Sequence, residues 1–329
     1  MKSSAFVATV LLPFCVIAAE PNRNVIVRGS YANSQLQFEK NKTGRVAFMG
    51  GSITQMNGYR PMVGNWLAKR FPKTKFEFVN AGISSTCSTT GAFRLKSEVL
   101  AKGRIDLFFI EFAVNDDQDA SHASRECVRG LEGIIRQARK AQPNMDIVVT
   151  HFVNPGMLEE LRSGKMPLPM AAHEKVLKAY DVSTIFLARE VADQIDAGKL
   201  TWKVFGGTHP KPAGNAIAAG MIGRLLTSAW AKPLGKKPEP HPVPKAVLDE
   251  GSYFKSEKQP MKDFMEWRAF KGIMEDMTLA EFETFMKALG VDNSSYYRYR
   301  KKYIEISNTI PFGSAHTDKY AEIRTKLID

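Results

Sequence analysis

Short apolar runs alternate with longer amphipathic segments along residues 45–230 of the chain. The runs have the length and composition of strands, and the longer segments repeat apolar residues three and four positions apart, as helices do. The expected strands are Val46–Met49, Phe76–Asn80, Ile105–Phe112, Asp146–Thr150 and Ser183–Phe186. The expected helices are Arg60–Phe71, Gly91–Lys102, Ser124–Ala141, Ala171–Tyr180, Leu187–Asp196 and Pro212–Ala231. This alternation predicts an α/β fold in which helices cover both faces of a parallel sheet.

One expected strand is apolar along most of its length. Residues 105–110 carry a single charged residue, Asp106. A strand that is buried on both faces has this composition, so the segment is predicted to lie in the middle of the sheet. In open parallel sheets, ligands bind at the carboxyl ends of the strands. The residues that follow each expected strand are therefore the first candidates for a functional site.

The pattern changes after residue 231. Residues 232–245 contain five prolines, which favours an extended linker. We therefore expect one large domain over residues 45–231, after an N-terminal extension over residues 20–44. The remaining residues, 246–329, are expected to form a mainly helical appendage, because Thr278 and Glu281 make a capping-box pattern ahead of apolar residues at helical spacing.

The first 19 residues have the organisation of a secretory signal peptide. Lys2 is followed by the apolar run 5–17 and then by the small residues Ala18 and Ala19. The run is too short to span a membrane. We expect cleavage near Ala19 and export to the periplasm or the extracellular space.

Composition and charge exclude some classes of protein. Of the 329 residues 44% are hydrophobic, as in ordinary globular proteins, and the formal net charge is +12. The large domain has no compact run of basic residues interleaved with aromatic ones, so a nucleic-acid partner is not expected. A basic surface of this kind is either simply solvated or favours anionic polysaccharide.

The cysteines leave one question open. Cys15 lies in the expected signal peptide, so an exported chain keeps only Cys87 and Cys127. An oxidising compartment permits a disulfide, but two cysteines do not define a disulfide framework. A bridge and two free thiols are both consistent with the sequence.

Four short stretches stand at the ends of expected strands or before the last helix. They are Gly50-Gly51-Ser52-Ile53-Thr54, Asn80-Ala81-Gly82, Val114-Asn115-Asp116 and Thr208-His209-Pro210. Together they offer a hydroxyl, a glycine N–H, an amide side chain and an imidazole. Acyl transfer needs this set, because a nucleophile must lose its proton to a base while fixed donors stabilise the oxyanion. Singly, each stretch also fits a turn, a helix cap or a surface position; their order at successive strand ends favours a site.

The four stretches, in this order, resemble the SGNH (GDSL-like) hydrolase superfamily over residues 45–230. The longer sequences around them resemble an exported, bacterial esterase-like branch of it. The resemblance implies a flavodoxin-like three-layer sandwich with about five parallel strands. It also implies ester hydrolysis without a metal or another cofactor. By position, Ser52 would be the nucleophile and His209 the general base and later acid. The Ser52 and Gly82 backbone N–H groups and the Asn115 amide would form the oxyanion hole.

The chain departs from the superfamily at one position. An aspartate usually stands three residues before the histidine and orients its imidazole, but this chain has Gly206 there. An imidazole without such an acceptor has a less well fixed tautomer. A backbone carbonyl of residues 202–205 or a carboxylate from elsewhere would have to replace it. Glu111 and Asp116 are the candidates by strand position, although either residue also fits a structural role.

These observations predict an exported serine esterase that works through an acyl-enzyme and removes acetyl groups from polysaccharide. Arg60, Arg94 and Trp202 are candidates to line the mouth of its site, although a helix-surface or core role fits each of them better. Lysophospholipids or short-chain acyl esters are the alternative substrates. A non-catalytic carbohydrate-binding protein on a decayed hydrolase scaffold is the alternative class. The missing aspartate favours that class, whereas the presence of both Ser52 and His209 opposes it.

Overall fold

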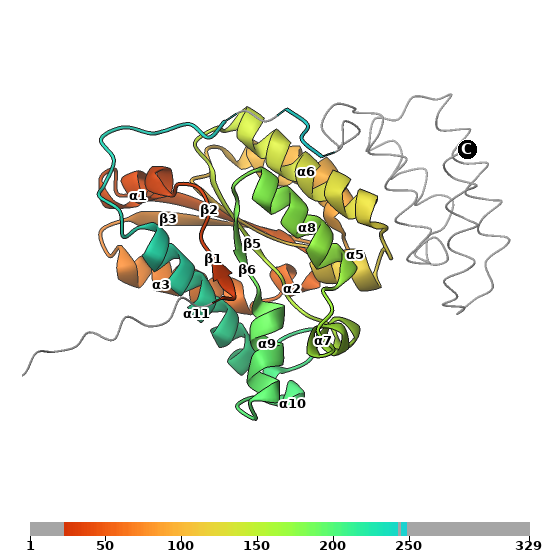
Figure 1. The fold of residues 1–329 in the computed structure, drawn as a ribbon. Helices are drawn as coiled ribbons and strands as arrows, with labels where there is room; N and C mark the ends of the chain where they lie inside the picture. The colour runs from red at the N-terminus through yellow and green to blue at the C-terminus, as the bar shows by residue number, and fades with distance from the viewer. Residues whose placement is uncertain (1–22, 243–244, 249–329) are drawn as a thin grey trace, which may run out of the picture.

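The computed structural model describes residues 23–242 and 245–248 (Figure 1). The expected signal peptide and nearly all of the expected C-terminal helical region lie outside these residues. A six-stranded sheet forms the centre of the described part, in the order β1-β6-β5-β4-β2-β3. Its strands are β1 (Val25–Ile26), β2 (Thr43–Gly50), β3 (Lys75–Gly82), β4 (Leu107–Glu111), β5 (Asp146–Thr150) and β6 (Ser183–Ile185). All neighbouring strands are parallel except β1, which pairs antiparallel with β6.

Helices cover both faces of this sheet, which confirms the expected α/β sandwich. The longer helices are α1 (Ala32–Glu39), α3 (Tyr59–Arg70), α4 (Ser88–Glu98), α6 (Ser124–Ala141), α7 (Pro155–Arg162), α8 (Leu168–Ala179), α9 (Leu187–Asp196) and α11 (Pro212–Ala229). Short helices α2 (Ser52–Gln55), α5 (Ala113–Gln118) and α10 (Trp202–Phe205) follow strands or connect longer elements, and a 3-10 turn spans Leu100–Lys102. Figure 1 shows α3 and α11 side by side, and α6 beside α8.

Each face of the sheet has its own apolar core. On one face, side chains of α1, α3, α9 and α11 pack on the sheet around Phe48 and Phe109, whose rings stack 4.9 Å apart. On the other face, α4, α6 and α8 pack around Met49, Phe108 and Ile110. Successive residues of β2 and β4 therefore enter opposite cores. The near-continuous apolar run that predicted a central strand follows from this burial on both sides.

The N-terminal extension contains two elements that the apolar pattern did not predict. Residues Val25 and Ile26 of β1 extend the sheet beyond β6, and α1 packs against the sheet through Phe38. A two-residue strand has no periodicity to detect. Helix α7 was also missed, although Asn154 followed by Pro155 is a helix-start signal; the Asn154 side chain accepts a hydrogen bond from the Met157 N–H.

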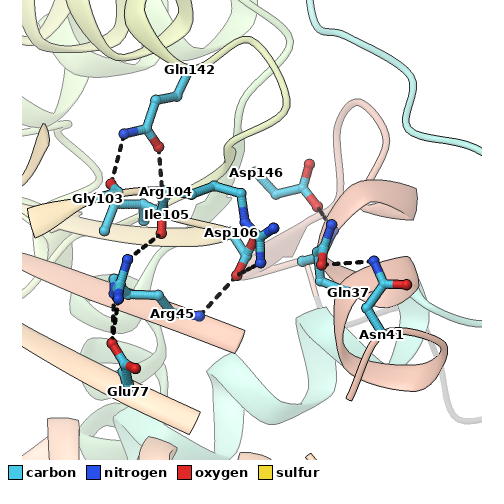
Figure 2. A network of polar contacts seen from close by, with 11 residues as sticks. Gln37, Asn41, Arg45, Glu77, Gly103, Arg104, Ile105, Asp106, Gln142 and Asp146 are labelled. Atoms are coloured by element: carbon cyan, nitrogen blue, oxygen red, sulfur yellow. Dashed lines mark hydrogen bonds and ion pairs between the residues drawn. The ribbon is translucent and has the colours of Figure 1, made fainter. Parts of the chain in front are cut away.

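Polar residues fasten the amino-terminal edge of the sheet (Figure 2). The buried Asp106 carboxylate accepts the Arg45 backbone N–H at 2.8 Å, and the Gln142 side chain bonds both the Ile105 N–H and the Gly103 carbonyl. A cavity of about 300 Å³ lies at this edge, lined in part by Arg104 and Gln142. This edge is opposite to the one at which the four candidate stretches lie.

The proline-rich segment after α11 is bound to the domain. The Asn33 side chain makes two hydrogen bonds of 2.8 Å with the Glu239 backbone, and Nε2 of His241 lies 2.8 Å from Oδ1 of Asp146. Further on, the Val247 N–H donates to the Glu132 carboxylate at 2.8 Å. Within the described residues, the segment therefore runs along the large domain.

Cys87 and Cys127 are both buried free thiols, so of the two arrangements that the sequence left open, the structure has free thiols and not a bridge. Within the described part of the chain, no helix combines the length and the apolar composition that crossing a membrane would require.

Candidate active site

Ser52 stands at the first position of α2, directly after β2. The strand ends at Gly50, Gly51 is the N-cap residue, and the short helix begins with Ser52. At this position a backbone N–H has no partner within the helix. Among the described residues, no protein acceptor takes the Ser52 N–H. The turn therefore presents a hydroxyl and a free backbone donor at the same point.

The ring of His209 lies against this hydroxyl. The distance from Oγ of Ser52 to Nε2 of His209 is 2.7 Å, across 157 positions of sequence. This distance lets the hydroxyl donate to a neutral imidazole, as removal of its proton by a general base requires. The structure thus brings together the two side chains on which the sequence-based hypothesis depends.

Two hydrogen bonds hold the loop that carries His209 in place. The backbone N–H of Lys211 donates to the carbonyl of Phe205 at 2.9 Å. The Asn215 side chain of α11 donates to the carbonyl of Pro210 at 2.6 Å. These bonds position His209 from the start of α11 even though the residue itself is exposed.

Asn115 lies at the same edge, in α5. Its side-chain amide packs so closely on Gly51 that a Cβ there would lie 2.1 Å from Oδ1. Nδ2 donates to the Asp119 carboxylate, and Oδ1 is buried without a hydrogen-bond partner in the described structure. An amide nitrogen carries two hydrogens, so one remains for a ligand. Asn115 is therefore close enough to the Ser52 turn to serve as a donor there.

Gly82 has a less open environment than its motif predicts. It pairs with Gly50 in the sheet register, but its N–H donates to Oδ1 of Asn80 at 3.0 Å. An oxyanion would have to compete with the Asn80 side chain for this donor. Nothing in the sequence indicates that bond, because Asn80 fits equally well as a strand-end residue.

Neither carboxylate that the sequence offered as an orienting group contacts His209. Oε1 of Glu111 accepts the Gly51 N–H at 3.0 Å and the Thr54 hydroxyl at 2.7 Å. Asp116 bonds groups of other helices, described below. Among the described residues, the ring of His209 is hydrogen-bonded to Ser52 alone. The pair is therefore a dyad in this structure.

The backbone at Gly206 explains why an aspartate does not stand there. Gly206 ends α10 with φ of +111°, and a Cβ built on it would lie 2.1 Å from the Lys211 backbone nitrogen. An L-residue at this position would be strained by both the dihedral angle and the contact. The loop that places His209 is thus incompatible with the residue that usually orients it.

The three residues expected at the mouth have structural partners. The guanidinium of Arg60 binds carbonyls at the end of α2, including that of Gln55 at 3.0 Å. Arg94 is buried and bonds the carbonyls of Gly50 and Ala81. Trp202 packs on the core and stacks on Phe205. Arg94 therefore supports the site from within the protein, as the alternative core role anticipated, while the partly exposed Arg60 braces the end of α2.

Asp116 anchors the helix that carries Asn115. Its carboxylate accepts the Ser88 N–H and hydroxyl, each at 2.7 Å, and lies 2.9 Å from Nε2 of His173. Burial raises the pKa of Asp116, but hydrogen bonds from His122 and His173 outweigh it and hold the pKa well below its ordinary value. The residue is thus a fixed anion that ties α5 to α4 and α8.

The same aspartate belongs to a cluster with the donor types of a metal site. Cys87, Asp116 and His122 place one ligand atom each within 4.8 Å of one another. The carboxylate is already occupied by protein donors, and Sγ of Cys87 lies 3.1 and 3.3 Å from the hydroxyls of Thr89 and Thr90. We interpret the cluster as a buried polar network behind Asn115.

Fold and site together define an α/β protein with a serine–histidine pair at the carboxyl edge of its sheet. Residues 48–217, just over half of the chain, match the model of the GDSL-like Lipase/Acylhydrolase family, and the chain belongs to that family. No curated protein matches the chain.

Solved structures with the same fold include a two-domain esterase (CEX) active on acetylated mannans. It aligns with a TM-score of 0.57 and 24% identity, over 69% of this chain and 60% of that one. The same esterase co-crystallised with mannopentaose aligns with a TM-score of 0.55 and 25% identity, over 66% and 58%. Axe2, an acetylxylan esterase from Geobacillus stearothermophilus, has a TM-score of 0.46 and 18% identity, over 56% of this chain and 94% of that one. The chain thus spans about three fifths of the two-domain esterase.

Proposed function

We propose that the protein is an exported serine esterase that removes acetyl groups from polysaccharide. The observation that carries this proposal is the 2.7 Å contact between Oγ of Ser52 and Nε2 of His209 at the carboxyl edge of the sheet. A serine hydroxyl is a weak nucleophile unless a base takes its proton. An imidazole at this distance is such a base.

In the proposed mechanism, His209 takes the proton while Oγ of Ser52 attacks the ester carbonyl. The Ser52 N–H and the Asn115 amide stabilise the oxyanion, and the Gly82 N–H contributes if it leaves Asn80. The imidazolium then gives its proton to the departing alcohol, and water repeats the attack on the acyl-enzyme. The products are the free alcohol and the carboxylic acid, and no further reactant is consumed.

The choice of polysaccharide rests on two supports. The two-domain esterase with the same fold acts on acetylated mannans, and an export signal would bring this chain to extracellular glycans. His209 is also exposed, and Ser52 is partly exposed. A site at an open edge of the sheet suits a side group on a long polymer.

Covalent labelling of the full-length protein tests the catalytic claim. A fluorophosphonate should modify Ser52, as located by peptide mass spectrometry, and should leave Ser52→Ala and His209→Ala unlabelled. Both substitutions should lower kcat for p-nitrophenyl acetate by at least about 10³-fold. An unlabelled wild-type protein would instead favour a non-catalytic binding protein.

Substrate and export need separate measurements. Acetate release should be faster from acetylated mannan or xylan than fatty-acid release from lysophosphatidylcholine; the reverse order would assign the alternative substrate class. In the producing cell, the mature protein should begin at Glu20. A retained Met1 in the exported fraction would contradict the predicted cleavage.

A further inference from the structure

The peptide unit between Gly50 and Gly51 is held from both sides by buried charged groups. Its carbonyl oxygen accepts a hydrogen bond from Nη2 of Arg94 at 2.9 Å. Its N–H donates to Oε1 of Glu111 at 3.0 Å. Because a peptide unit is planar and rigid, two bonds of opposite sense fix the rotation of the whole plane. That plane is followed by the Gly51–Ser52 peptide, which leads into Ser52.

Glu111 also holds the first turn of α2. The same Oε1 accepts the Thr54 N–H at 3.2 Å and the Thr54 hydroxyl at 2.7 Å. Gly51, the N-cap residue, makes no side-chain cap of its own. A four-residue helix is not stable alone, and a carboxylate near its N-terminus supplies both acceptors and favourable charge. Glu111 therefore caps α2 from the neighbouring strand.

The sheet register makes room for this arrangement. Gly50 pairs with Glu111 across β2 and β4. A Cβ on Gly50 would lie 2.2 Å from Oε1 of Glu111, so the carboxylate occupies the space that a larger residue would fill. The absence of a side chain at Gly50 is thus matched to the carboxylate at Glu111.

Glu111 and Arg94 together form a clamp on the Gly50–Gly51 peptide, and Arg94 also binds the neighbouring strand. Nη1 donates to the Ala81 carbonyl at 2.6 Å, while Nη2 binds the Gly50 carbonyl and the Thr86 hydroxyl. One guanidinium therefore joins the end of β2 to the end of β3, just before Gly82.

Two titratable groups of neighbouring helices face Glu111: Arg94 of α4, and Tyr59 of α3 through the Thr54 hydroxyl. Burial raises the pKa of Glu111 to about 7, although its hydrogen bonds with Thr54 and Gly51 lower it. Protonation would weaken the carboxylate as an acceptor. The clamp thus has a strong and a weak form near neutral pH.

We propose that Glu111 is a positioning residue for the nucleophile: its carboxylate, with Arg94, fixes the Gly50–Gly51 peptide and the first turn of α2. The hydroxyl of Ser52 is thereby held toward His209. This role rests on the proposed esterase function and replaces the idea that Glu111 orients the imidazole.

Three variants of the full-length protein test the role. Glu111→Ala removes the acceptor and should lower kcat for p-nitrophenyl acetate about hundredfold with little change in KM, since small misplacements of reacting groups have effects of this size. Glu111→Gln keeps one acceptor oxygen and should lose about tenfold. The matched control Glu77→Gln removes a carboxylate from the exposed Arg45 pair on β3 and should retain wild-type activity.

Two further readouts separate positioning from simple stability. As pH falls through about 7, kcat/KM of the wild type should fall by up to about tenfold more than that of Glu111→Gln, because only the wild type has a carboxylate at this position to protonate. A raised folded-state pKa stabilises the fold below the unfolded value of 4.5, and this contribution is lost as pH rises through about 7. At about pH 8, Glu111→Gln should therefore have a free energy of unfolding no lower than that of wild type, while its kcat stays below the wild-type value.

The outcomes distinguish the inference from the function on which it rests. A wild type that reacts with fluorophosphonate but has the same acid limb of kcat/KM as Glu111→Gln, or a Glu111→Gln variant equal to wild type in kcat, would overturn the positioning role and leave the esterase. A wild type that neither labels nor hydrolyses esters would overturn both. Slower labelling of Glu111→Gln with an unchanged melting temperature would support the proposal.

Discussion

The side-chain amide of Asn115 packs directly on the α-carbon of Gly51, so closely that a Cβ at Gly51 would lie 2.1 Å from Oδ1. The contact joins α5 to the turn that presents Ser52. It explains why the first residue of the turn after β2 has no side chain. It also means that the amide and the nucleophile cannot move independently.

Gly51→Ala should separate these groups. The added methyl cannot share space with the amide, so either Asn115 or the turn must shift. We expect kcat for p-nitrophenyl acetate to fall about hundredfold, because displacement by about 1 Å has effects of this size. Gly156→Ala is the control, since a Cβ there meets only Oδ1 of Asn154 at 3.6 Å. Full activity in Gly51→Ala would contradict the close contact.

Asn115→Ala tests the amide itself. Loss of one oxyanion donor typically raises the barrier by about 3 kcal/mol, so kcat should fall by about a hundredfold or more. KM should change little, because the donor acts on charge that develops in the transition state. Circular dichroism should show an unchanged fold. Wild-type turnover in this variant would remove Asn115 from the proposed oxyanion hole.

Gly206→Asp restores the acidic residue that the superfamily usually has three positions before the histidine. We expect no gain in kcat, because the backbone here has φ of +111° and leaves no room for a Cβ beside the Lys211 nitrogen. The free energy of unfolding should fall by about 1–3 kcal/mol. Gly206→Ala carries the same strain without the carboxylate and should be equally destabilised. A faster Gly206→Asp enzyme would show that the loop adapts.

Acid stability should depend on Glu174. Its carboxylate accepts a hydrogen bond from the Thr184 hydroxyl at 2.6 Å and one from the guanidinium of Arg28 at 2.8 Å. Burial raises its pKa, but bonds with His151, Thr184 and Arg28 prevail and lower it to about 2. A lowered pKa stabilises the fold above the unfolded value of 4.5, and this contribution disappears as pH falls from 4.5 through about 2.

Glu174→Gln should therefore lose about 2 kcal/mol of unfolding free energy at about pH 7, the usual size for bonds to a buried charge. Urea denaturation should show the difference from wild type narrowing toward about pH 3. The control is Asp196→Asn, which breaks the exposed pair with Arg162 and should change stability by less than about 1 kcal/mol at either pH. A difference that stayed constant with pH would refute the assignment.

The sequence was most informative where the apolar pattern was long. Helices α6 and α9 have the bounds that were expected, and the alternation correctly indicated a sheet with helices on both faces. Ser52 lies at the carboxyl edge because it directly follows the parallel strand β2, whereas His209 reaches the same edge from the loop between α10 and α11. The two-residue β1 and the capped helix α7 gave too little periodicity for the same method.

The hydrophobic pattern does not predict which polar side chains form hydrogen bonds with one another. Glu111 and Arg94 both read as buried or helix-surface residues, and nothing in their spacing reveals that they bond the two sides of one peptide unit. The same holds for Asn80, which takes the Gly82 N–H. Such bonds depend on distances of a few tenths of an ångström, whereas periodicity specifies only which face a residue occupies.

Gly82 of β3, Gly50 of β2 and Glu111 of β4 are paired with one another across the sheet. A slip of β2 by a single residue would break this pairing and turn every side chain of the strand to the opposite face. Helices could still form beside such a misaligned sheet. Return of ester hydrolysis after refolding would therefore report correct strand alignment, whereas return of the helical signal alone would not.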